Sequence, residues 1–139
     1  MKLLVIGCGS IGKRHIRNAI EIGISNQNII AVDTRDDRLQ EVKNYGVEKV
    51  FKDFDDAIKE EFDMALICSP TSLHIKQCLT LAKLKKNLFI EKPLDSSLEG
   101  SEVLSQLVKQ NKLTTMIAYI FRFAPSIEFV KKKIDENVI

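Results

Sequence analysis

The sequence predicts an α/β fold in which one domain is built on a doubly wound parallel sheet. Short apolar runs alternate with stretches of helical period along the 139 residues. The runs are apolar at successive positions, as expected for strands that helices cover on both faces. A glycine-rich turn follows the first run. Strict alternation with right-handed crossovers then favours the strand order 3-2-1-4-5-6.

The bounds of the individual elements follow from the continuous apolar runs, which predict strands, and from the helical period of the stretches between them. Strands are predicted over residues 3–6, 29–32, 64–68, 88–90 and 115–119, with a brief additional strand at Val50 and Phe51. Helices are predicted over residues 11–22, 37–45, 54–59, 74–84 and 98–110. A last helix over residues 125–137 places Ile127, Val130 and Ile134 on one side.

Composition excludes several classes of protein. Hydrophobic residues make up 45% of the chain and charged residues 29%, which is ordinary for a globular domain that buries a core without disulfides. The net charge of +2 is too small to predict a nucleic-acid partner. No apolar run reaches the roughly 18 residues that a membrane span requires, and the first predicted strand leaves no room for a signal peptide. We therefore expect a cytoplasmic protein without a membrane partner.

Cysteine usage agrees with a reducing compartment. Cys8, Cys68 and Cys78 are odd in number, show no C-x-x-C spacing and have no nearby histidines suited to a metal. Cys8 and Cys68 lie on or just after predicted strands, where a thiol usually serves as a small buried apolar group. The sequence therefore predicts no metal site and no redox role for these residues.

A Gly-x-Gly-x-x-Gly turn lies between the first predicted strand and the first predicted helix. Gly7 permits a sharp turn, Gly9 lets a pyrophosphate approach the main chain, and Gly12 lets the helix pack closely on the sheet. The N–H groups at the helix start, around Ser10 and Ile11, would hold phosphates together with the helix dipole. The hexamer alone is weak evidence, but its position between strand and helix, with an acid about 20 residues on, predicts dinucleotide binding.

Asp33, at the end of the second predicted strand, is the acid that this motif requires. Its carboxylate would accept hydrogen bonds from both adenosine ribose hydroxyls and repel a 2′-phosphate, which favours NAD over NADP. Thr34 adjoins the same position. Arg35 carries a guanidinium that would partly offset the repulsion, so NADP remains open as the cofactor.

Three further turns follow predicted strands at the edge where ligands of open α/β sheets bind. The first is Ser69-Pro70-Thr71, followed by His74; the second is Glu91-Lys92-Pro93; the third runs from Tyr119 through Arg122 to Pro125. Together with the glycine turn, these segments resemble the N-terminal domain of the glucose-fructose oxidoreductase, inositol dehydrogenase and rhizopine-catabolism family of NAD(P)-dependent oxidoreductases. The resemblance spans essentially the whole chain, and Glu91-Lys92-Pro93 is its most specific element.

The resemblance implies a Rossmann fold and a set of functional residues. Lys92 is the expected catalytic residue, reaching the nicotinamide ribose and the reacting hydroxyl, where its ammonium would stabilise a developing alkoxide. Glu91 is expected to pair with Lys92 or with a ribose hydroxyl. The loop Ser69-Pro70-Thr71 would lie against the cofactor near His74, and Arg122 would border the nicotinamide side.

Structural alternatives exist for each of these residues. Lys92 could be a solvated lysine at a strand end, and Ser69-Pro70-Thr71 could simply begin the next helix. His15 is at a position where the resembled family often carries histidine. Both His15 and His74 could be partly buried helix residues. Lys13, Arg14 and Arg17 could form a solvated basic face or approach the pyrophosphate.

The chain departs from the resembled family chiefly in length. Ala118 and Ala124 are small departures, but family members continue into an α/β substrate domain that is absent here. We therefore expect a dinucleotide-binding domain over residues 1–123 and, over 124–139, a helix that leads toward the absent domain. An uncovered surface on this helix predicts self-association, such as a homo-oligomer, or an exposed apolar patch.

The expected function is the NAD(P)-binding part of an oxidoreductase. Such an enzyme would transfer a hydride between a nicotinamide cofactor and a secondary alcohol or ketone of a sugar, cyclitol or related polyol. The alternative is a stand-alone nucleotide-binding or sensing module without catalysis. A methyltransferase also has a glycine turn after its first strand, but Glu91-Lys92-Pro93 has no evident use there.

Overall fold

The computed structural model describes residues 1–138, and its strands alternate with helices from the first element to the last. The strands are β1 (Leu3–Ile6), β2 (Ile29–Val32), β3 (Lys49–Phe51), β4 (Met64–Ile67), β5 (Asn87–Ile90) and β6 (Thr115–Ile117). The α-helices are α1 (Ser10–Glu21), α2 (Asp36–Lys43), α3 (Phe54–Ala57), α4 (His74–Lys83), α5 (Ser101–Gln110) and α6 (Pro125–Asp135). Three 3₁₀ turns are η1 (Asn26–Asn28), η2 (Thr71–Leu73) and η3 (Ile120–Phe123).

All six strands form one parallel sheet in the order β3-β2-β1-β4-β5-β6, which confirms the predicted doubly wound topology. β1 lies at the centre and pairs with β2 through Leu3 opposite Ile29 and with β4 through Leu3 opposite Met64. The chain therefore crosses over between β3 and β4, and the order of strands reverses at β1. Ligands of such sheets bind beside this reversal, beyond the carboxyl ends of the strands.

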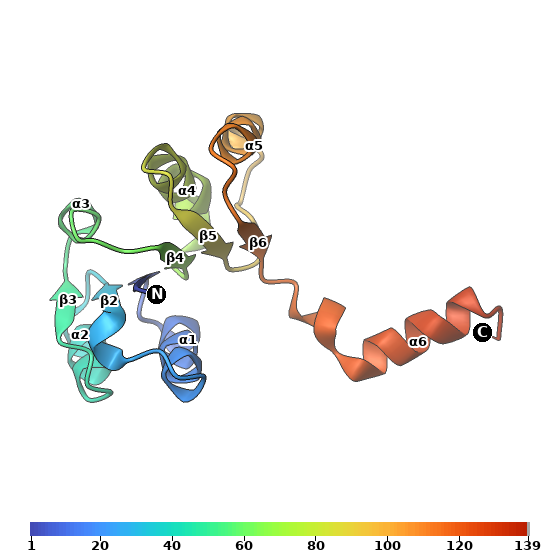
Figure 1. Ribbon diagram of the computed structural model, residues 1–139, viewed down its shortest axis with the longest axis horizontal. Helices are drawn as coiled ribbons and strands as arrows, with labels where there is room; N and C mark the ends of the chain where they lie inside the picture. Colours follow the sequence, from blue (N-terminus) through green and yellow to red (C-terminus); the bar gives the residue numbers. More distant parts are fainter. Residues whose placement is uncertain (139) are drawn as a thin grey trace.

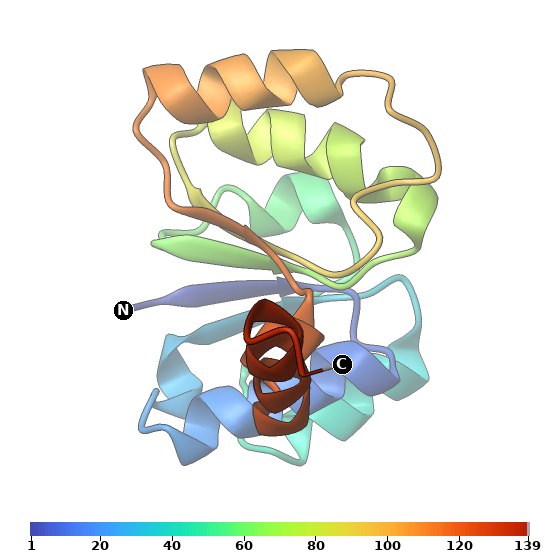
Figure 2. The same cartoon turned by 90° about the vertical axis from the view of Figure 1, so that its right-hand side faces the viewer.

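Helices cover both faces of the sheet, as Figure 2 shows. On one face, Leu4 and Ile67 pack with residues of α3, α4 and α5 such as Ala57, Leu81 and Leu104. On the other face, odd-numbered β1 residues and their neighbours pack with residues of α1 and α2. Each central strand therefore buries both of its sides, which explains why its sequence is apolar without alternation.

Each predicted helix differs from the observed one by one to three residues at one or both ends, and two of these differences have a cause in the main chain. The fifth helix begins at Ser101 and not at residue 98, because Gly100 adopts a left-handed conformation with φ of +83° and Leu98 is 78% exposed. The last helix ends at Asp135, and Asn137 has a φ of +55°. A left-handed residue cannot continue a right-handed helix, so turn geometry sets both boundaries.

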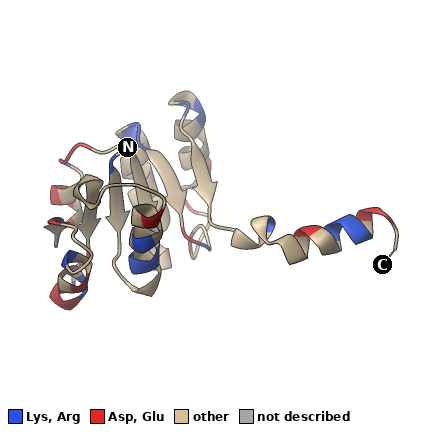
Figure 3. Ribbon diagram, turned by 60° about the horizontal axis from the view of Figure 1, so that its bottom comes forward, with Lys and Arg blue, Asp and Glu red and all other residues tan. Residues whose placement is uncertain are grey.

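The segment after β6 leaves the sheet. In Figure 1, η3 and α6 extend away from the body formed by the other elements. Neither element buries a residue. Figure 3 shows basic residues toward the far end of α6, whereas an acidic residue, Glu128, lies in its first turn. Among the α-helices described, none is long and apolar enough to span a membrane.

Candidate functional site

The turns after β1, β2, β4 and β5 meet at one edge of the sheet. We call this the carboxyl edge and define it as residues 7–12, 33–35, 68–74 and 91–93. It contains every predicted site residue except Arg122, which lies in η3 beyond the edge strand β6. The sequence therefore placed these segments on neighbouring strands, and the structure shows which side chains contact one another.

The glycine turn is the most sterically restricted part of this edge. Gly7 has a φ of +91°, and a Cβ there would lie 2.5 Å from the carbonyl oxygen of Cys68. A Cβ on Gly12 would lie 1.9 Å from the carbonyl oxygen of Gly7. The space beside Gly9 is open, since the nearest atom to a Cβ there is Arg38 Nη1 at 3.9 Å. Two glycines are therefore needed for packing, and the third leaves the main chain accessible.

The start of α1 is available to an anion. Gly9 is its N-cap and provides no side-chain hydrogen bond, and no acidic residue lies in the first turn. The first N–H groups of a helix have no partner within the helix, and the helix dipole favours negative charge there. This arrangement fits a phosphate of a dinucleotide.

Asp33 ties the glycine turn to the end of β2. Its side chain is buried, and its Oδ2 accepts a hydrogen bond from the Cys8 amide at 2.8 Å. Its Oδ1 accepts one from the Arg35 amide at 2.9 Å. A carboxylate offers about four acceptor positions, so ribose hydroxyls would share this group with the protein's own amides. Asp33 thus fits the ribose role and also shapes the turn.

The guanidinium at Asp33 belongs to Arg38, which the sequence analysis did not identify. Arg38 Nη1 lies 3.2 Å from Asp33 Oδ2, whereas Arg35 directs its guanidinium at Asp37 with distances of 2.9 and 2.5 Å. Arg35, whose guanidinium was expected to offset the repulsion of a 2′-phosphate, thus pairs with Asp37, and Arg38 is the cation in contact with Asp33. Arg38 is the third residue of α2, and this position at the helix start was the signal available in the sequence.

A cavity of about 200 Å³ opens over the glycine turn and Asp33. Gly7 lines it from the end of β1, Asp33 and Thr34 from the end of β2, and Ser69 and Pro70 from the end of β4. It therefore lies at the strand-order reversal, where the adenosine end of a dinucleotide binds in this type of sheet. The open Gly9 backbone, the uncapped start of α1 and this cavity together fit the predicted cofactor.

The turn after β4 is held by a buried histidine. His74 is 1% exposed, and its Nε2 lies 2.9 Å from the carbonyl oxygen of Ser69. Its Nδ1 lies 3.1 Å from the carbonyl oxygen of Pro93. Ser69 Oγ donates to Gln77 Oε1 at 2.6 Å, which ties the turn to α4. Pro70 and Thr71 continue the turn, with Thr71 beginning η2.

The turn after β5 contains Glu91 and Lys92. Glu91 Oε1 lies 2.7 Å from His15 Nε2 of α1, and its Oε2 accepts from the Lys92 amide at 3.2 Å. Glu91 therefore contacts His15 and the main chain of Lys92, and not the Lys92 ammonium, which was one of its two expected partners; the other, a ribose hydroxyl, stays a prediction. The Lys92–Pro93 peptide bond is cis. The Lys92 side chain is exposed and takes part in none of the ion pairs described for residues 1–138.

The cysteines lie in environments that suppress thiolate formation. Burial raises the pKa of the Cys8 thiol to about 12, and the nearby Asp33 carboxylate acts in the same direction. Burial also raises the pKa of Cys78 to about 12 and that of Cys68 above its usual range. Among the described residues there is no cluster of His, Cys, Asp and Glu that could hold a metal.

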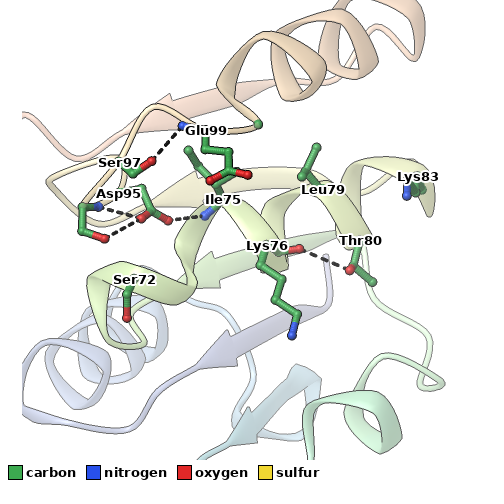
Figure 4. A pocket seen from close by; sticks show the side chains of 11 residues that line it. Ser72, Ile75, Lys76, Leu79, Thr80, Lys83, Asp95, Ser97 and Glu99 are labelled. Atoms are coloured by element: carbon green, nitrogen blue, oxygen red, sulfur yellow. Dashed lines mark hydrogen bonds between the residues drawn. The ribbon is translucent and has the colours of Figure 1, made fainter.

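A larger groove of about 530 Å³ lies between α4 and the loop that precedes α5 (Figure 4). Its Asp95 accepts a hydrogen bond from the Ile75 amide at 2.9 Å and from the Ser96 amide at 2.6 Å. The carboxylate therefore caps the start of α4. This groove lies outside the glycine turn and Asp33, so we place the candidate site at the carboxyl edge.

Comparison with models of known protein families assigns the chain to a family. The model described as "Oxidoreductase family, NAD-binding Rossmann fold" matches residues 1–119. The chain therefore belongs to this oxidoreductase family and has its NAD-binding Rossmann fold, which confirms the resemblance stated from the sequence. The match ends two residues after β6, before η3 and α6.

The relatives include inositol dehydrogenases. The chain is 33% identical to the myo-inositol 2-dehydrogenase of Thermotoga maritima, with all of this chain aligned to 42% of that protein. It is 28% identical to the scyllo-inositol 2-dehydrogenase (NAD(+)) of Bacillus subtilis, of which it covers 41%. The chain thus spans about two fifths of the length of these relatives.

A solved structure supports the same assignment. The scyllo-inositol dehydrogenase of Lactobacillus casei with bound NAD(H) and scyllo-inositol matches with a TM-score of 0.85 and 30% identity. The match covers all of this chain and 42% of that one. The backbone of this chain is therefore that of a domain found in an enzyme structure containing NAD(H).

Proposed function

We propose that this chain is the cofactor-binding part of a dehydrogenase that interconverts a secondary alcohol and a ketone on a cyclitol, sugar or related polyol. The observation that carries the proposal is the buried Asp33 carboxylate beside an open Gly9 main chain at the strand-order reversal. The names of the inositol dehydrogenase relatives support the substrate class. NAD, when bound, supplies the acceptor or donor of the hydride.

The residues of the carboxyl edge have distinct proposed roles. The amides at the start of α1, around Ser10 and Ile11, hold the pyrophosphate, and Asp33 binds the adenosine ribose. The Ser69-Pro70-Thr71 turn borders the cofactor. Lys92 is the proposed catalytic residue, because its exposed ammonium at the end of β5 can stabilise negative charge on a substrate oxygen.

Residues 124–138 have a different proposed role. We place the boundary of the dinucleotide-binding domain at residue 123, four residues after the family match ends. The apolar side of α6 would pack against the substrate-binding part of the enzyme, and Arg122 would lie between the two. Exposed Ile127, Val130 and Ile134 support this role, since a large uncovered apolar patch commonly marks an interface.

Calorimetric titration with NADH and with NADPH tests the proposal. We expect NADH to bind at least about tenfold more tightly, because the Asp33 carboxylate repels a 2′-phosphate. Asp33→Ala should lose this preference and weaken NADH binding as the Cys8 amide loses its acceptor. Asp36→Ala is a matched control, since Asp36 is exposed and pairs with Lys52 at 2.7 Å.

Two results would contradict the proposal. Absence of binding of either dinucleotide would remove the cofactor role, and the stand-alone module with a different nucleotide would then be the better description. An unchanged preference in Asp33→Ala would mean that another group selects the cofactor, with Arg38 the first residue to substitute.

A further inference from the structure

We propose that His15 and His74, the chain's two histidines, are positioning residues that hold the main chain at Lys92 and Pro93 from the two faces of the sheet. His15 belongs to α1 and His74 to α4, and these helices cover opposite faces. The inference rests on the proposed function, in which Lys92 is the catalytic residue. The inference explains how the main chain that carries the Lys92 side chain is held in place.

The contact from α1 acts through Glu91. His15 Nε2 donates to Glu91 Oε1 at 2.7 Å, and the side chains are 17% and 13% exposed. Glu91 Oε2 accepts from the Lys92 amide at 3.2 Å. The His15 ring also meets the Phe89 ring edge to face, with centroids 5.3 Å apart. Packing and hydrogen bonding therefore fix the imidazole, which fixes the carboxylate that holds the Lys92 amide.

The contact from α4 is direct. His74 Nδ1 lies 3.1 Å from the Pro93 carbonyl oxygen, and its Nε2 lies 2.9 Å from the Ser69 carbonyl oxygen. A protonated imidazole donates to both carbonyls, and each neutral tautomer donates to one. Because the ring is buried, it bridges the turn after β4 and the turn after β5 without competition from water.

The two contacts hold the backbone and leave the ammonium free. The Lys92 N–H meets the carboxylate of the adjacent Glu91, which His15 of α1 contacts, and the Pro93 carbonyl meets His74 at the start of α4. The Lys92 side chain itself is exposed. A catalytic side chain requires a main chain that supporting residues hold in place and a tip that can reach a ligand. The geometry at Lys92 provides both. The same contacts link Lys92 to the helix whose start is the proposed phosphate site.

Backbone order at Lys92 tests the inference. In the wild-type chain without ligand, we expect an NMR order parameter for the Lys92 amide of about 0.85, the value of rigid backbone. His15→Ala and His74→Leu should each lower it below about 0.6, the flexible range. The Leu88 amide is the internal reference, because it donates to Thr114 O at 3.0 Å within the sheet. It should remain rigid in both variants.

Matched variants separate positioning from general stability. His15→Gln keeps a donor for Glu91 and should restore much of the order at Lys92. Asn18→Ala, an exposed position one turn further along α1, should behave as wild type. If His74→Leu does not fold, His15→Ala carries the test of lost order, and His74→Gln, which retains one donor, should keep much of the order at Lys92.

The outcomes discriminate between the two proposals. Lys92 remaining rigid in His15→Ala and His74→Leu would overturn the inference, as would equal loosening of Leu88. Loss of order confined to residues 91–93, with rescue by His15→Gln, would support it. Failure of the wild-type chain to bind NADH would refute the proposed function, whereas the order parameters of the ligand-free chain would still decide whether the histidines position Lys92.

Discussion

Residues 3–118 and residues 120–138 contain the same kind of amphipathic helix but differ in what those helices bury. In α4, His74, Ile75, Cys78, Leu81 and Ala82 are buried, and the last three pack in the core with the sheet and α5. In η3 and α6, no residue is buried. Their exposed apolar side chains are Ile120, Phe121, Phe123, Ile127, Phe129, Val130 and Ile134. An apolar stripe predicts a helix in both regions, but only packing against a partner stabilises it.

This difference indicates which part of the chain contributes the free energy of unfolding. α6 has 11 residues, and isolated helices shorter than about 12–15 residues are marginal in water. The free energy of unfolding should therefore reside in residues 3–118, and substitutions in the two regions should differ greatly in effect.

The largest loss of stability is expected for Gly12→Val. A Cβ at this position would lie 1.9 Å from the Gly7 carbonyl oxygen, and that atom belongs to the main chain of the turn. We expect the free energy of unfolding in urea to fall by at least about 4 kcal/mol, or the chain not to fold. Gly23→Ala is the control: no atom lies within 4 Å of a Cβ there, so only the left-handed backbone opposes it. Its loss should be about 1–2 kcal/mol.

The next largest effect is expected for Leu4→Ala in the central strand. Leu4 is fully buried between the sheet and the helices of one face, so its truncation leaves a cavity. Urea unfolding should show a loss of about 2–5 kcal/mol. Leu98→Ala, at a residue that is 78% exposed, should change stability by less than about 0.5 kcal/mol. Equal losses in the two variants would contradict the assigned core.

A smaller effect is expected for Asp95→Ala at the start of α4. The Ile75 amide, which donates to this carboxylate, lowers the pKa of Asp95 below its usual 3.8. A lowered pKa in the folded chain means that the contribution is full above pH 3.8 and declines as the pH falls through the folded-state value.

Thermal melts at neutral pH should therefore show Asp95→Ala about 1 kcal/mol less stable, as for loss of a helix cap. As the pH falls below 3.8 the difference should shrink, and the two proteins should converge once the pH is below the folded-state pKa of Asp95. Glu99→Ala removes an exposed carboxylate from the same loop and is the control for charge. A difference between wild type and Asp95→Ala that grows in acid would refute this account.

The smallest effect on folding is expected in α6. Replacing Ile127, Val130 and Ile134 by alanine should change the free energy of unfolding by less than about 0.5 kcal/mol per site, because all three are exposed. The same variant should bind less ANS and show less self-association in size-exclusion chromatography. A loss above about 2 kcal/mol would show that α6 packs on the sheet domain in solution.

The fold was largely predictable from the sequence, because strands that are buried on both faces are apolar at successive positions, and this pattern is visible in the sequence. Continuous apolar runs such as residues 3–6 predicted the strands, and chirality of the crossovers predicted their order, which the structure confirms. The helix ends at Gly100 and Asn137 were not predicted, because a left-handed conformation depends on local turn geometry that periodicity does not report.

The candidate site was predictable as a set of segments but not as a set of contacts. Strand order alone brings the turns after β1, β2, β4 and β5 to one edge. The partners of Asp33 and Glu91 depend on the directions in which the side chains point. His15 and Glu91, for example, are 76 residues apart in the sequence. No spacing rule relates such positions. The His15–Glu91 contact therefore emerged only from the structure, whereas Arg38 was missed although its position near Asp33 at a helix start could be read from the sequence.

The central position of β1 has a consequence for the growing polypeptide. β1 is synthesised before the other five strands described, but one of its two neighbours, β4, begins only at Met64, and the Gly7 turn packs against Cys68. The glycine turn therefore cannot reach its final shape until more than half of the domain has left the ribosome. A fragment ending at residue 60 should show no cooperative melting by circular dichroism, so nascent chains of this length are the ones that we expect chaperones to bind.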